Sequence, residues 1–93
     1  MSKKLVVYTM KNCQWCKQFK DKLKENNVKF YNRDIEKHKE EYELFVEITQ
    51  NDFVPSFMIV DEESESAELF APDRDYNDIN EALDIIKDKI LLI

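Results

Sequence analysis

The chain has 93 residues, 43% of them hydrophobic and 12% aromatic, which is the size and composition of one globular domain spanning residues 1–93. Its formal net charge of −6 argues against binding to nucleic acid or to an anionic membrane surface, and no apolar segment approaches the length that spans a bilayer. Because two cysteines are too few for a disulfide scaffold and the N-terminus does not resemble a signal peptide, we expect a cytoplasmic protein and, by default, a monomer.

The first half of the chain alternates strand and helix patterns. Residues 4–9 are expected to form a buried strand, because 5–8 are continuously apolar. After a short loop, Cys13 opens a helix that ends near Asn26 and Asn27, and a second strand is predicted over 28–34. The apolar faces of this helix and of the one that follows the second strand show helical spacing: Cys16, Phe19 and Leu23 in the first, and Tyr42, Phe45, Val46 and Thr49, widened by Leu44 and Ile48, in the next.

The second half adds a hairpin and a last helix. A strand over 56–60 begins just past Pro55, an acidic turn follows, and a short strand is predicted over 67–71. Apolar residues then repeat at helical spacing from Tyr76 to Ile90, with Asp73 or Asp75 as a candidate cap. The order β-α-β-α-β-β-α predicts an α/β fold with a mixed four-stranded sheet and helices able to cover both of its faces.

Glycine is absent from the chain. Backbone positions that need a positive φ must therefore use residues such as Asn or Asp, which tolerate it best. We expect such turns at Asn26-Asn27, Asn51-Asp52 and Asp61.

Both cysteines lie in one motif, Cys13-Gln14-Trp15-Cys16, between a predicted strand and a predicted helix. This placement puts the Cys13 sulfur at a helix N-terminus, where free backbone N–H groups favour a thiolate. A zinc site within one chain lacks ligands, because there is no second cysteine pair and His38 is the only histidine. A redox role is therefore favoured, and a metal or cluster shared between two chains remains the alternative.

Several separated segments together resemble glutaredoxins, small members of the thioredoxin-like superfamily. They are Tyr8-Thr9 at the end of the first strand, the Cys13–Cys16 motif, Val54-Pro55 before the third strand, and residues 74–79. The resemblance implies a sheet in the order 2-1-3-4, an active site at the C-terminal end of the first strand, and a cis Pro55. It also implies that the backbone of Val54 pairs with an extended substrate.

The activity that the resemblance implies is dithiol reduction of protein disulfides and glutathione mixed disulfides. Cys13 would attack and Cys16 would resolve the mixed disulfide, with glutathione as co-substrate, a disulfide-containing protein as partner, no metal and no tightly bound cofactor. A narrower form is an electron donor to ribonucleotide reductase. The residues carried over as substrate-binding are Lys11, Trp15, Val54, Pro55, Arg74, Tyr76, Asn77 and Asp78.

The chain departs from the family pattern at three places. Gln14 replaces the usual proline between the cysteines, and Met10 replaces a frequent lysine, with Lys11 one place later. Arg74-Asp75 replaces two glycines near the γ-glutamyl end of glutathione. These departures leave two alternatives: a protein-specific reductant regenerated by a thioredoxin-type reductase, and a thioredoxin-like binding module or a dimer bridged by a metal or cluster.

Overall fold

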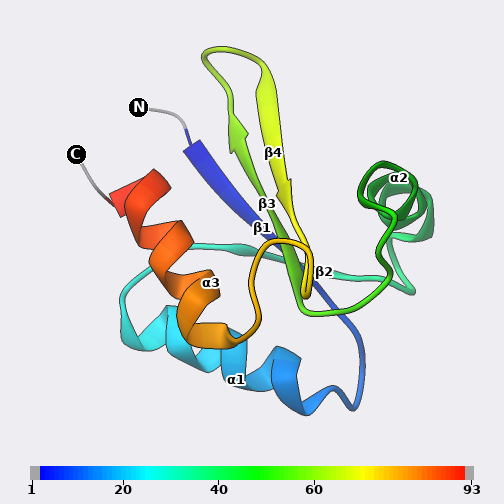
Figure 1. The fold of residues 1–93 in the computed structure, drawn as a ribbon, viewed down its shortest axis with the longest axis horizontal. Helices are drawn as coiled ribbons and strands as arrows, with labels where there is room; N and C mark the ends of the chain where they lie inside the picture. Colours follow the sequence, from blue (N-terminus) through cyan, green and yellow to red (C-terminus); the bar gives the residue numbers. More distant parts are fainter. Residues whose placement is uncertain (1–2, 92–93) are drawn as a thin grey trace.

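A four-stranded sheet forms the centre of the computed structural model, which describes residues 3–91 (Figure 1). Its strands are β1 (Lys3–Thr9), β2 (Tyr31–Asp34), β3 (Ser56–Asp61) and β4 (Ser66–Phe70), and they lie in the order β2-β1-β3-β4. The β1–β2 pair is parallel, whereas the β1–β3 and β3–β4 pairs are antiparallel. The predicted α/β fold with a mixed 2-1-3-4 sheet is confirmed.

Helices cover both faces of the sheet (Figure 1). On one face lie α1 (Gln14–Glu25) and α3 (Ile79–Ile86), and on the other lies α2 (Lys39–Thr49). Successive residues of β1 alternate between two cores: Leu5 and Val7 pack with α1 and α3, and Val6 and Tyr8 pack with α2. Burial on both sides explains why the first strand is continuously apolar.

The second strand is shorter than predicted. The strand begins at Tyr31, because the residues just before it still complete the C-terminal end of α1. The Val28 N–H donates to the Leu23 carbonyl at 2.9 Å, and the Val28 side chain is buried in the core. The fourth strand covers Ser66–Phe70, one residue earlier than the predicted 67–71.

The prediction that Leu44 and Ile48 widen the inner face of α2 is wrong. Their exposed fractions are 61% and 67%, whereas Tyr42 and Phe45 are buried. At 3.6 residues per turn, both positions lie on the side of the helix away from the stripe that contains Tyr42, Phe45 and Thr49.

The last helix starts later than Tyr76 and has a different cap. Asp78 is its N-cap, and its Oδ1 accepts a hydrogen bond from the Glu81 N–H at 2.9 Å. The expected caps, Asp73 and Asp75, belong instead to the preceding loop. Beyond α3 the chain continues as a π-helical turn over Lys87–Leu91.

Within residues 3–91, positive φ occurs at Asn12, Asn27, Gln50, Glu65 and Asp73, so Asn27 was predicted correctly. Asn51, Asp52 and Asp61 do not adopt it. Asn51 and Asp61 instead form turns through their side chains. Asn51 Oδ1 accepts a hydrogen bond from the backbone N–H two residues later at 2.9 Å, and Asp61 Oδ1 does the same at 3.1 Å.

Candidate active site

Cys13 and Cys16 lie where β1 has ended and α1 begins. Cys13 is the N-cap of α1, and its Sγ accepts a hydrogen bond from the Cys16 N–H at 3.1 Å. The two sulfurs are joined in a disulfide, with Cα atoms 5.2 Å apart. Cys16 is 1% exposed among the residues of the core, whereas Cys13 is half-buried. The helix spacing predicted this difference between the two side chains.

The surroundings of Cys13 suit a negatively charged sulfur in the reduced form. A backbone N–H points at Sγ, and the positive end of the α1 dipole lies behind it. The first turn of α1 carries no acidic residue that would oppose the charge. The arrangement therefore stabilises a thiolate at Cys13.

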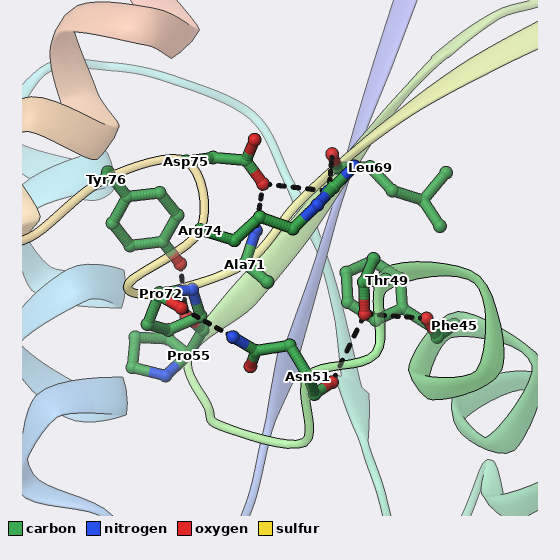
Figure 2. Close-up of polar contacts among 10 residues, drawn as sticks. All are labelled: Phe45, Thr49, Asn51, Pro55, Leu69, Ala71, Pro72, Arg74, Asp75 and Tyr76. Carbon is green, nitrogen blue, oxygen red and sulfur yellow. Dashed lines mark hydrogen bonds and ion pairs between the residues drawn. The ribbon is translucent and has the colours of Figure 1, made fainter.

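The Val54-Pro55 peptide bond is cis, as the resemblance implied. Pro55 is buried and Val54 half-buried, and two contacts hold this turn in place (Figure 2). The buried Tyr76 donates its hydroxyl hydrogen to the Pro55 carbonyl. Asn51, four residues before Pro55, donates from Nδ2 to the Pro72 carbonyl at 2.6 Å. The end of α2, the cis turn and the loop before α3 are thus fastened together.

Polar contacts within the loop over 71–76 occupy both Arg74 and Asp75 (Figure 2). Asp75 Oδ2 accepts hydrogen bonds from the Ala71 N–H at 2.8 Å and from Arg74 Nη1 at 2.9 Å. Arg74 Nη1 also donates to the Leu69 carbonyl at 3.2 Å. The guanidinium that could pair with a substrate carboxylate already has partners in its own loop.

The other predicted substrate-binding residues fall into separate groups. Trp15 is 58% exposed and lines a shallow hollow with Asp78, between α1 and the start of α3. Lys11 lines a different hollow, which contains Cys13. Asn77 is exposed, and its backbone N–H donates to Glu81 Oε1 at 2.7 Å. Tyr76 is only 6% exposed, so it contacts the cis turn from inside the fold.

A comparison with protein families relates the cysteine pair and the cis turn to one known family. A family model described as Glutaredoxin matches residues 5–64, a span that contains both cysteines and the cis Val54-Pro55 bond. The chain belongs to the glutaredoxin family. A search of curated proteins gave no match. With its Cys-x-x-Cys pair at the start of α1, this glutaredoxin is a thiol–disulfide oxidoreductase.

Members of the family generally work without a tightly bound cofactor. Within residues 3–91 of this glutaredoxin, no three His, Cys, Asp or Glu side chains lie close enough to hold a metal ion. Over the same range, no helix combines the length and apolar character needed to cross a membrane.

Sequence reasoning missed a partly buried polar cluster made by Tyr8 of β1, Arg33 of β2 and Glu41 of α2. The Tyr8 hydroxyl donates to Glu41 Oε2 at 2.6 Å, and Glu41 Oε1 lies 3.7 Å from Arg33 Nε. Burial, together with the hydrogen bond to Glu41, raises the pKa of Tyr8 well above its ordinary value. No pattern in the sequence links these three positions, because they lie on three different elements.

Sequence reasoning also missed two lysines beside Cys13. Lys17 and Lys20 line the same hollow as Cys13 and Lys11. Their signal was present in the sequence, since they follow Cys13 at i+4 and i+7 and so share its side of the helix.

Proposed function

We propose that this glutaredoxin reduces protein disulfides and mixed disulfides between proteins and glutathione, with Cys13 as the nucleophile and Cys16 as the resolving thiol. The observation that carries the proposal is the difference between the two sulfurs. Cys13 is the accessible sulfur at the helix N-terminus and accepts a backbone N–H, whereas Cys16 is buried. We further propose that residues 1–93 act as one domain and as a monomer in the cytoplasm, where thiols are kept reduced.

The reaction starts from the dithiol form. The Cys13 thiolate attacks one sulfur of the substrate disulfide, so a bond from Sγ to that sulfur forms, the substrate S–S bond breaks, and the second substrate sulfur leaves as a thiolate that takes up a proton. The Cys16 thiolate then attacks Cys13 Sγ and releases the first substrate thiol. Two electrons have passed to the substrate, and the protein is left with the Cys13–Cys16 disulfide that the structure shows. Two molecules of glutathione would return it to the dithiol.

Substrate would lie along the surfaces that surround Cys13. We assign Val54 the backbone pairing with an extended substrate segment, next to the buried Pro55. Trp15 offers an exposed apolar surface beside Asp78, and Lys11 a positive charge beside Cys13. Asn77 and Arg74 extend the proposed binding surface along the loop before α3, where Tyr76 supports it from inside.

Single-cysteine variants test the two roles. With a glutathionylated peptide as substrate, Cys13→Ser should abolish turnover, because no accessible thiolate remains. Cys16→Ser should retain part of the activity, since glutathione itself can resolve the mixed disulfide. Peptide deglutathionylation is the measurement, and equal losses in the two variants would contradict the assignment.

A second candidate, a reductant that is not regenerated by glutathione, is favoured by the loop over 71–76. Arg74 and Asp75 stand where the family has two glycines, and they are paired with each other. An assay coupled to NADPH consumption should compare glutathione plus glutathione reductase with a thioredoxin-type reductase. Faster turnover with glutathione supports the first candidate, and turnover only with the reductase supports the second. Adding the disulfide form of ribonucleotide reductase as substrate tests electron donation to that enzyme.

A further inference from the structure

Three lysines of α1 lie on the same side of the helix as Cys13. Lys17, Lys20 and Lys24, which we call the lysine stripe, follow Cys13 at i+4, i+7 and i+11 and therefore share one side of the helix. Lys17 and Lys24 are exposed and Lys20 is half-buried. The hollow beside Cys13 is lined by Lys17, Lys20 and Lys11, and every other residue lining it is uncharged.

Most of these lysines form no ion pair within the described part of the chain. Over residues 3–91, Lys17 pairs with Asp21 at 2.9 Å, while Lys11, Lys20 and Lys24 form no ion pair. The hydrogen bond from Lys17 lowers the pKa of Asp21. This carboxylate also attracts Lys20 and Lys24 at longer range, which lowers its pKa further. The positive charge beside the reactive sulfur is therefore only partly neutralised by the protein.

The helix dipole does not account for Lys17 or Lys20. It favours cations in the last turn, where Lys24 lies, but it disfavours them near the N-terminus, where Lys17 lies, and it has little effect at Lys20 in the middle of α1. The Lys17–Asp21 pair also has the less favourable order, with the cation nearer the N-terminus. Lys17 and Lys20 both add positive charge to the hollow that contains Cys13, and Lys17 does so at a small cost to the helix.

Basic and acidic residues are also unevenly distributed along the sequence. Residues 1–29 hold eight lysines against two acidic residues, whereas residues 30–93 hold six basic and eighteen acidic residues. An acidic segment is therefore attracted by the lysines of α1 and repelled by the acidic remainder of the chain, which orients it toward α1.

We propose that the lysine stripe docks an acidic segment of a protein substrate next to the disulfide that Cys13 attacks. The proposal rests on the oxidoreductase function proposed above and narrows its substrate class. A protein segment suits the site better than a nucleic acid does, because the hollow contains a sulfur nucleophile and the remaining surface of this acidic chain repels a polyanion.

The test uses three peptides that share one intramolecular disulfide and differ only in their flanks, which carry Asp and Glu, Ser, or Lys. Fully reduced protein in excess over peptide gives a single-turnover rate constant that is independent of the regenerating system. The variants are Lys20→Glu/Lys24→Glu and the milder Lys20→Gln/Lys24→Gln. The matched control is Lys29→Glu/Lys37→Glu, which makes the same change in net charge at exposed positions outside α1.

At low ionic strength we expect wild type to favour the acidic peptide over the basic one by about 10-fold or more, within the range of electrostatic steering. The glutamate pair should remove this preference, the glutamine pair should give an intermediate value, and the control should change it less than twofold. Salt should shrink the preference, because the screening length falls to about 8 Å at 0.15 M. The preference is the ratio of the rates with the acidic and the basic peptide, so a change in the reactivity of Cys13 that Lys20→Glu causes cancels out. Circular dichroism spectra and thermal unfolding that match wild type show that the variants fold.

Three results overturn the docking proposal while leaving the proposed function intact. The first is equal wild-type rates with all three peptides, and the second is an equal loss in the control and in the stripe variants. Binding of single-stranded RNA at 0.15 M salt that the glutamate pair abolishes, with unchanged peptide rates, also overturns it. Failure of wild type to reduce any of the three peptides contradicts the proposed function itself.

Discussion

The hydrogen bond from Tyr76 to the Pro55 carbonyl offers a sharp test of how the cis turn is held. Tyr76→Phe removes only the hydroxyl and keeps the ring, which stacks on Phe57 with ring centroids 5.5 Å apart. Because the contact is buried, the Pro55 carbonyl loses its donor without gaining water. We expect a loss of about 1–3 kcal/mol in the free energy of unfolding. For a chain of this size, each kcal/mol lowers Tm by about 4–8 °C.

The measurement is urea unfolding followed by circular dichroism at pH 7 and pH 9. Burial, with a smaller contribution from Asp75, raises the pKa of Tyr76, so its hydroxyl stays protonated and the loss should be equal at the two pH values. Tyr31→Phe is the control, since Tyr31 is 48% exposed and its hydroxyl forms no hydrogen bond within residues 3–91. A Tyr76→Phe variant within 0.5 kcal/mol of wild type would refute this account of the turn.

Two further predictions concern stability. Tyr8→Phe should cost about 1–2 kcal/mol at pH 7 because Glu41 loses its donor. The raised pKa of Tyr8 gives stability that is fully present below about pH 10 and lost as pH rises, so the difference from wild type should shrink by about 1.4 kcal/mol per pH unit above pH 10 in denaturant titrations. A constant difference from pH 7 to pH 11.5 would contradict this. Glu65→Gly should stabilise the hairpin by about 0.5–1 kcal/mol, since Glu65 has a φ of 55°, while Ser64→Gly, at a negative φ, should not. Thermal unfolding of both glycine variants measures the change in stability, and stabilisation by Ser64→Gly alone would count against backbone strain at position 65.

The arrangement of the elements was predictable because it follows from burial. The short apolar run in β1 is typical of a strand covered on both faces, and the helical spacing of Cys16, Phe19 and Leu23 predicts that the second cysteine faces the core. Once the motif lay between that strand and that helix, the relative burial of the two sulfurs followed.

What the sequence did not disclose depends on pairs of groups that meet only in the folded chain. Leu44 and Ile48 are apolar yet exposed, because they lie on the side of α2 away from Tyr42 and Phe45. Asp78 rather than Asp75 caps α3, because Asp75 is held by the Ala71 N–H and by Arg74. Composition gives no account of such a choice between neighbouring carboxylates.

The loop over 71–76 shows how a chain without glycine shapes the far end of the proposed binding surface. Its one positive φ lies at Asp73, and the rest of its form depends on hydrogen bonds made by Arg74 and Asp75. A substrate carboxylate that approaches Arg74 must compete with the carboxylate that already holds it, and that exchange would also loosen the Asp75 contact with Ala71. In the lysine stripe, by contrast, only Lys17 forms an ion pair within residues 3–91, and Lys20 lines the hollow beside Cys13 without one. Recognition of an anionic substrate at the stripe therefore costs this fold less than recognition at the loop, which favours acidic protein segments over a ligand that must bind at Arg74.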